Sequence, residues 1–283
     1  MKLGVSSYSF AHLIKNEGWS YADVCKKAKE LGFDGIEFVN LNCWDPTLDE
    51  EACAREIRAL CEELGLEIAA YTVGANFLSD DVEKEKAKLR HCIDIASILG
   101  APVLRHDAAF SLKKLPRYGW REGIVDMAPH IREITEYAAE RGIRTCTENH
   151  GFIYQAPERV EQLIRSVDHP NYGWLIDVGN FLCADADPAE AVTIAAPYAF
   201  HVHVKDFLFK SGMEIRPEGF FSTTGGNYLR GTVIGHGVVP VPKCINILKK
   251  AGYEGYVSIE FEGLEQNLKA LEMGYTYLRR LMA

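Results

Sequence analysis

One junction recurs along this 283-residue chain: a stretch with helical periodicity ends at a glycine, and a short apolar run follows at once. A glycine just past a helix takes the left-handed backbone conformation that closes the last turn without steric cost. Each such junction therefore predicts a helix that is followed directly by a strand. The five glycines are Gly32, Gly65, Gly100, Gly142 and Gly252.

Helix starts are marked as well. Ser20 precedes Asp23, and Thr47 precedes Glu50, at the spacing at which a hydroxyl and a carboxylate cap a helix reciprocally. Near-continuous apolar strands that alternate with such helices, without a break in composition, favour a single (β/α)8 TIM barrel over residues 1–283 rather than an open sheet. The predicted strands cover residues 2–9, 35–40, 67–73, 102–107, 143–149, 173–178, 200–206 and 256–261.

The connection after the seventh predicted strand is much longer than the others. Residues 207–239 are rich in aromatic residues and glycine before the next helix begins near Val241. Long connections in compact domains are uncommon and usually functional. We therefore expect a lid-like insertion here.

Composition and charge exclude several classes of function. The net charge of −9 and the pI near 5.5 argue against non-specific binding to nucleic acid. No apolar run reaches the roughly 20 residues that a membrane span needs. The first residues lead directly into a strand-like run without the features of a signal peptide, which favours a cytoplasmic protein.

Polar side chains follow four consecutive predicted strands. These are Glu148, Asp177, His203 and Glu260, and the carboxyl ends of parallel barrel strands all face one mouth. Three converging carboxylates raise one another's pKa unless a cation lies among them. We therefore predict one divalent metal ion at this mouth. One histidine with three carboxylates suits Mn²⁺ best, and Mg²⁺, Co²⁺ and Zn²⁺ stay open.

Other polar residues lie near the same strand ends. We expect His150 and His106 to line the mouth as polar contacts or as an acid, and Asn180 follows Asp177 closely enough to contact a substrate. His201 lies deeper on its strand than His203 and is expected to be buried and hydrogen-bonded. By strand alternation Lys205 should point away from His203, so a substrate role and a packing role are both open for it.

Several segments resemble the sugar phosphate isomerase/epimerase superfamily, the xylose isomerase-like barrels. They are LIDVGN around Asp177, HVHVKD around His203, RGTVIGHG from Arg230 and GYEGYVSIEFEG at the eighth strand. The resemblance implies that Glu148, Asp177, His203 and Glu260 hold the metal and that the two glutamates transfer protons next to a carbonyl. It also implies that Arg230 holds the substrate, a small carbohydrate such as a keto-sugar or keto-inositol, in an isomerase or epimerase.

Three alternatives stay open. Ketose 3-epimerases of this superfamily carry a glutamate and a histidine where this chain has Tyr154 and Asn180, and the run Glu-Asn-His-Gly at 148–151 is closer to an inosose dehydratase-like lyase. An apurinic endonuclease-like phosphodiesterase would need metal ligands where this chain has Leu229 and Gly231. A non-catalytic partner or binding subunit is the third alternative, and a homo-oligomer is left open as the quaternary state.

Overall fold

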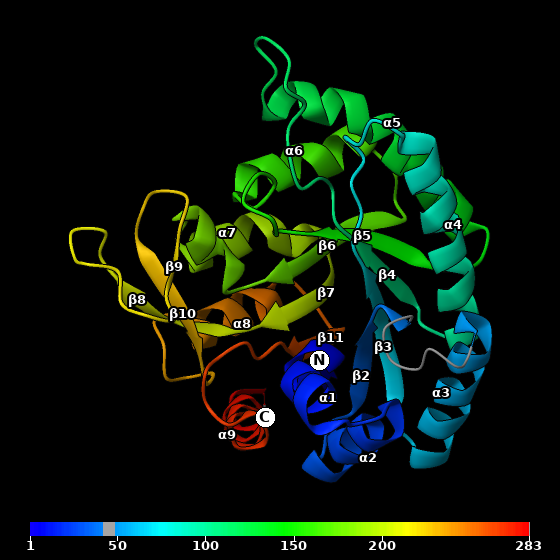
Figure 1. Cartoon of the computed structure of the whole chain (residues 1–283), viewed down its shortest axis with the longest axis vertical. Helices are drawn as coiled ribbons and strands as arrows, with labels where there is room; N and C mark the ends of the chain where they lie inside the picture. The colour runs from blue at the N-terminus through cyan, green and yellow to red at the C-terminus, as the bar shows by residue number, and fades with distance from the viewer. Residues whose placement is uncertain (42–48, 283) are drawn as a thin grey trace.

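Eight parallel strands close into one barrel in the computed structural model, which describes residues 1–41 and 49–282 (Figure 1). Each predicted strand overlaps one of them, so the predicted (β/α)8 TIM barrel is confirmed. Around the barrel the order is β1-β11-β7-β6-β5-β4-β3-β2. The strands are β1 (Lys2–Ser6), β2 (Gly35–Val39), β3 (Glu67–Val73), β4 (Val103–His106), β5 (Arg144–Glu148), β6 (Tyr172–Asp177), β7 (Ala199–Val204) and β11 (Tyr256–Ile259).

Helices surround the barrel (Figure 1). Their ends follow the predicted signals, because the five marked glycines all have positive φ angles between +60° and +93°. The helices are α1 (Ala11–Glu17), α2 (Tyr21–Leu31), α3 (Glu50–Leu64), α4 (Val82–Leu99), α5 (Trp120–Ala139), α6 (Pro157–Val167), α7 (Pro188–Ala195), α8 (Val241–Lys250) and α9 (Asn267–Met282), with short 3₁₀ turns η1 (Ser7–Phe10), η3 (Asn180–Ala184) and η4 (Ala196–Tyr198).

The two predicted helix caps have different outcomes. Ser20 and Asp23 form the predicted reciprocal capping box at the start of α2. Thr47 lies outside the described residues. At the start of α3 the Asp49 carboxylate accepts a hydrogen bond from the backbone N–H of Ala52 at 2.7 Å. The N-terminus of α3 therefore has its own carboxylate cap immediately before the first helical turn.

The barrel interior changes from apolar to polar along its strands. Ala70, Val103, Cys146 and Leu175 form a small buried cluster inside it. Successive side chains on a strand point to opposite faces, so the residue two positions further on enters the interior again. Those residues are Thr72, Arg105, Glu148 and Asp177. The alternation thus places charged side chains at the carboxyl ends of β4, β5 and β6.

The insertion after β7 contains a small antiparallel sheet, which projects from the side of the barrel (Figure 1). It consists of β8 (Asp206–Lys210), β9 (Phe221–Ser222) and β10 (Tyr228–Thr232). At its base the Asp206 carboxylate accepts hydrogen bonds from the backbone N–H groups of Phe207, Gly235, Gly237 and Val239. A Cβ at Gly237 would lie 2.2 Å from Asp206 Oδ1, so only glycine fits this close approach. The base of the insertion is fixed, and lid movement of its tip stays a prediction.

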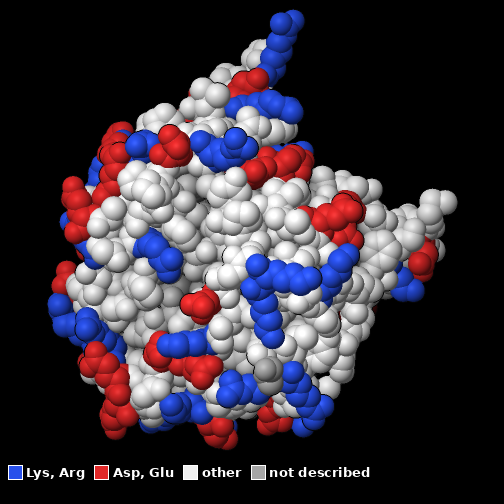
Figure 2. All heavy atoms as spheres, turned by 180° about the vertical axis from the view of Figure 1, so that it is seen from behind, with Lys and Arg blue, Asp and Glu red and all other residues white. Residues whose placement is uncertain are grey.

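Figure 2 shows the face opposite to that of Figure 1, on which basic and acidic side chains are interspersed around the edge. Within the part of the chain that the structure describes, no helix combines the length and apolar character that a bilayer crossing requires. The described cysteines are buried, as expected for residues that pack as small hydrophobes.

Candidate metal centre and active site

The four predicted metal ligands come together at the carboxyl ends of β5, β6, β7 and β11. Nδ1 of His203 lies 3.8 Å from Glu148 Oε1, 3.9 Å from Asp177 Oδ2 and 3.7 Å from Glu260 Oε1. One ligand atom from each of the four residues lies within 4.8 Å of all the others. These separations are too long for hydrogen bonds, but they leave the four atoms facing a common point.

Nδ1 of His203 is buried and has no hydrogen bond among the described residues, and Asp177 Oδ2 has only the ammonium of Lys205, at 3.1 Å. Burial raises the pKa of Asp177 to about 7; Lys205 opposes the rise, and the Glu148 and Glu260 charges add to it. Unpaired buried polar atoms and repelling carboxylates are costly, and a divalent cation would remove both costs. One imidazole with three carboxylates is a donor set that Mn²⁺, Mg²⁺ and Co²⁺ accept, so these residues fit a divalent ion.

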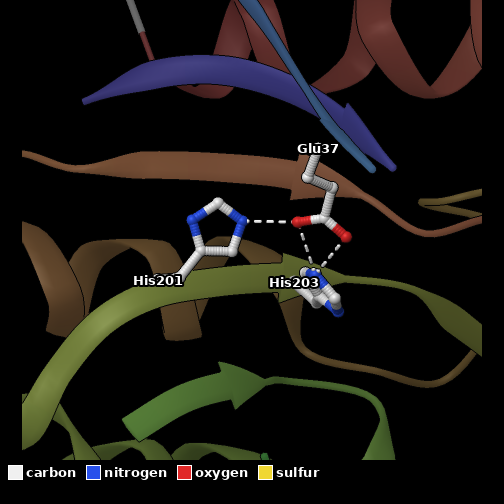
Figure 3. Close-up of side chains that lie close together, drawn as sticks. All are labelled: Glu37, His201 and His203. Atoms are coloured by element: carbon white, nitrogen blue, oxygen red, sulfur yellow. Dashed lines mark hydrogen bonds and ion pairs between the residues drawn. The ribbon is translucent and has the colours of Figure 1, made fainter. Parts of the chain in front are cut away.

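A glutamate from the opposite half of the chain orients the histidine. Glu37 on β2 is fully buried, and its Oε2 accepts a hydrogen bond from Nε2 of His203 at 2.8 Å (Figure 3). The same oxygen accepts a second one from Nε2 of His201 at 2.6 Å. With Nε2 as the donor, Nδ1 of His203 faces the three carboxylates and would offer its lone pair to a metal ion bound among them. A carboxylate that fixes the tautomer in this way is the usual support for a metal-binding histidine.

Arginine and lysine partly neutralise the carboxylates. Nη2 of Arg105 lies 2.6 Å from Glu148 Oε2 and 2.9 Å from Asp107 Oδ1. Burial would raise the pKa of Glu148, but Arg105 and His203 outweigh it and hold that pKa well below its usual range. Nζ of Lys205 contacts Glu260 and lies 3.1 Å from Asp177 Oδ2. Burial would lower the pKa of Lys205, but Asp177, Glu260 and Glu262 raise it well above the usual value, so the side chain is an ammonium.

His150 and Asn180 both reach the site. Nδ2 of Asn180 donates a hydrogen bond to Glu148 Oε1 at 2.9 Å. Nδ1 of His150 lies 2.9 Å from Asp107 Oδ1, and the side chain is about half exposed. Burial would lower the pKa of His150, but the hydrogen bond to Asp107 and the charge of Glu148 raise it. The imidazole therefore holds a proton more readily than a free histidine does.

A cavity of about 430 Å³ opens beside these residues, between the barrel mouth and the insertion. Its lining includes His150, Asn180, Lys205, Arg230 and Glu262. Arg230 lies on β10, and its Nη2 is 2.9 Å from Glu265 Oε1. Four of the five predicted substrate-binding residues thus face one cavity that is large enough for a small carbohydrate.

Residues 25–281 match the family model described as xylose isomerase-like TIM barrel. The chain belongs to this family. The xylose isomerase-like barrel therefore accounts for nearly the whole chain, and the resemblance noted in the sequence is confirmed.

Characterised relatives of this xylose isomerase-like barrel include enzymes. The rhizopine catabolism protein MocC of Rhizobium meliloti is 27% identical over 80% of this chain and 73% of its own length. The 3-dehydroshikimate dehydratase of Bacillus anthracis is 23% identical over 93% of this chain and 91% of its own. The inosose dehydratase of Clostridium perfringens is 25% identical, but the match covers only 48% of this chain and 46% of that enzyme.

Solved structures share the fold. A xylose isomerase-like TIM barrel protein from Mycobacterium smegmatis in complex with magnesium has a TM-score of 0.72 at 20% identity, covering 99% of this chain and 96% of that one. The D-psicose 3-epimerase from Clostridium cellulolyticum H10, solved with D-tagatose, has a TM-score of 0.73 at 17% identity, covering 100% of this chain and 98% of that one.

Two expectations about this family member are wrong. His106 does not line the mouth: it is fully buried, its Nδ1 pairs with the carbonyl of Asp107, and its ring packs between Phe77 and Tyr172. Strand alternation points Arg105, its neighbour, into the barrel instead. Lys205 does not point away from His203, because β7 ends at Val204 and the alternation ends with the strand.

Sequence reasoning missed Glu37 and Arg105. Both were visible as charged residues inside otherwise apolar strand patterns, GIEFV and PVLRH. Charged side chains are rarely buried unless they are paired, so each was a signal for a partner inside the barrel. The partners themselves come from distant parts of the chain, and the pattern within a strand does not name them. His201 lies as expected, buried and hydrogen-bonded.

His106 should make the fold sensitive to acid. Burial lowers its pKa from 6.5 to about 4. Between these two pH values the unfolded chain takes up a proton that the folded chain refuses, so stability is lost as pH falls through this range. The loss should approach about 3 kcal/mol, at roughly 1.4 kcal/mol per pKa unit.

Urea unfolding of the chelator-treated protein at pH 7 and pH 4.5 measures this loss, with His106→Phe as the variant and His12→Phe as the control. His12 is exposed on α1. The His106 variant should lose less stability on acidification than either the wild type or the control. Equal losses in all three proteins would contradict the assignment.

Proposed function

We propose that this protein is a metal-dependent dehydratase that removes water from a keto-inositol or a related polyhydroxylated ketone. One carboxylate takes the proton next to the carbonyl, and a separate acid protonates the departing hydroxyl. The observation that carries the proposal is the difference between the two glutamates: Arg105 and Asn180 engage Glu148, while Glu260 lies closer to solvent beside Lys205. The names of the relatives support it, since two of them are dehydratases.

Glu260 is the proton acceptor in this proposal. Its side chain is 13% exposed, whereas those of Glu148 and Asp177 are 3% and 0% exposed. It is therefore the most exposed of the three carboxylates, and its partner Lys205 lines the cavity. Lys205 contacts it and holds it in place. A divalent ion held by Glu148, Asp177, His203 and Glu260 would polarise the carbonyl and make the neighbouring C–H more acidic.

His150 is the proton donor. Its ring lines the cavity, and Asp107 accepts its Nδ1 hydrogen bond, which leaves Nε2 available to a ligand. Because its pKa is raised, a protonated imidazole is available near neutral pH. The substrate loses a proton to Glu260 and a hydroxyl that leaves as water with the proton of His150. The product is an unsaturated ketone.

Epimerisation is the second candidate, favoured by one observation. Glu148 and Glu260 flank His203 Nδ1 from different strands, at 3.8 and 3.7 Å. Two carboxylates on different sides of one carbon are what removal and return of a proton require. The low pKa of Glu148 opposes this role, because a carboxylate held by Arg105 is a weak proton acceptor. We therefore place dehydration first.

Elemental analysis of the purified protein, followed by a panel of keto-inositols and keto-sugars in deuterated water, tests the proposal. Dehydration should appear as an absorbance of the conjugated ketone together with loss of the substrate. An epimerase would instead give a stereoisomer carrying one deuterium and no such absorbance. Proton exchange without either product would contradict the acid role of His150, and no reaction with any ketone would favour a binding subunit.

A phosphodiesterase is disfavoured by the residues beside Arg230. Leu229 is buried and Gly231 has no side chain, so neither offers an additional metal ligand. Cleavage of a plasmid with abasic sites is the matching assay, and we expect none.

A further inference from the structure

The cations that line the cavity are already paired with carboxylates. Arg230 contacts Glu265, and Lys205 contacts both Asp177 and Glu260. His150 contacts Asp107. Among the described residues that line the cavity, no other side chain is cationic. Residues 42–48, of sequence NCWDPTL, contain no lysine, arginine or histidine. A carboxylate on a ligand would therefore find no unpaired cation here.

The charge balance around the cavity also disfavours a ligand that carries a carboxylate. Three fixed cations, Arg105, Lys205 and Arg230, face a larger set of carboxylates. A divalent ion would add two positive charges to these three, and the total would still not exceed the number of carboxylates. An anionic ligand would then add a negative charge to a site whose own carboxylates are largely buried, and such a charge is costly without a partner. The carboxylates are Asp107, Glu148, Asp177, Glu260, Glu262 and Glu265.

The cavity also offers hydrogen-bonding groups that suit hydroxyls. The guanidinium of Arg230 lines the cavity. Asn180 and Glu262 line the same cavity. A hydroxyl group donates to a carboxylate and accepts from a guanidinium, so one polyol can satisfy both kinds of group. A carboxylate can only accept, and it would face Glu262 with like charge.

We propose that this cavity selects neutral polyhydroxylated ligands over carboxylate-bearing ones, with Glu265 as a specificity-determining residue that neutralises Arg230. The inference rests on the proposed function only for the location of the substrate. It separates this chain from dehydratases of ring acids, such as its 3-dehydroshikimate relative, and assigns it neutral ring ketones.

Isothermal titration of the full-length, Mn²⁺-loaded protein with myo-inositol and with quinate tests the selection. Both are polyhydroxylated six-membered rings, and only quinate carries a carboxylate. The wild type should bind quinate at least about tenfold more weakly, a difference of 1.4 kcal/mol. Equal or tighter binding of quinate would overturn the inference, and so would the absence of binding by either ring at millimolar concentration.

Glu265→Gln tests the assigned residue. Glutamine keeps an oxygen for the hydrogen bonds from Thr232 and Arg230, and it removes only the charge. The variant should bind quinate more tightly than the wild type does. The ratio of the Kd values for quinate and myo-inositol should fall by about fivefold or more, where a tenfold change corresponds to about 1.4 kcal/mol. The control is Glu272→Gln, which removes an exposed carboxylate on α9 that pairs with Lys269. An unchanged ratio of the two Kd values in a folded Glu265 variant would show that Glu265 does not determine the specificity.

These binding results are independent of turnover. If no ketone reacts but the preference for inositol holds, the proposed reaction fails and the selectivity stands. If a neutral ketone is dehydrated while quinate binds as well as inositol, the reaction stands and the selectivity fails.

Discussion

Glu260→Gln should lower kcat by about 10² or more on the true substrate, the usual effect of losing a positioned base. Glutamine keeps an oxygen that can face the metal position, but it cannot accept a proton from carbon. KM should change little, because the residues that line the cavity are untouched. Exchange of the substrate C–H with deuterated solvent should fall by the same factor, since Glu260 is the proposed acceptor.

The control for this variant is Glu254→Gln, an exposed carboxylate shortly before β11. It has the same charge change on a neighbouring segment and should keep wild-type kcat. Metal content of both variants is measured in parallel. If Glu260→Gln retains metal and full exchange, then Glu260 serves only as a ligand and the proposed proton transfer to Glu260 is wrong.

Asp177→Asn should weaken metal binding by about 100-fold or more, because even residues that merely support a ligand are worth 10- to 100-fold in affinity. The substitution removes the charge and keeps Oδ1, which accepts hydrogen bonds from the N–H groups of Gly179 and Asn180 at 2.9 Å. Titration of the chelator-treated protein with Mn²⁺, followed by calorimetry, measures the affinity.

Measurements of thermal stability distinguish loss of a metal ligand from loss of the fold. The raised pKa of Asp177 means that its ionised form is disfavoured in the metal-free protein, so its contribution to stability is lost as pH rises from about 4 through about 7. At pH 8 the metal-free Asp177→Asn variant should therefore melt at or above the wild-type temperature. Asp80→Ala, at an exposed position, is the control for metal affinity. A variant that both melts early and loses metal would indicate a structural role instead.

The sequence predicted the barrel because its signals are local. Glycines such as Gly32 and Gly100 mark helix ends within a few residues, and the strand patterns repeat without interruption. The group of Glu148, Asp177, His203 and Glu260 was predictable for the same reason, since barrel topology alone brings strand ends together. Whether these residues hold a metal stays a prediction.

The predictions from the sequence were wrong where the direction of a side chain depends on tertiary structure. His106 and Arg105 are adjacent, and the sequence does not say which of the two faces the barrel interior until the register of β4 is known. Here Arg105 lies opposite Cys146 on β5, and both point inward. Lys205 follows the last residue of β7, where the backbone turns toward β8 and alternation no longer applies. Glu37 was missed because its histidine partners are more than 160 positions away.

The position of Glu37 limits how this barrel could be divided into fragments that keep the candidate metal centre. All four proposed ligands come from the second half of the sequence, so a fragment of residues 143–283 would carry the whole set. It would lack β2, and with it the only carboxylate among the described residues that fixes the tautomer of His203. A half-barrel, or a chimera built with a foreign first half, would thus inherit the ligands without their alignment. The orientation of a proposed metal ligand in the second half of the chain thus depends on a carboxylate from the first half.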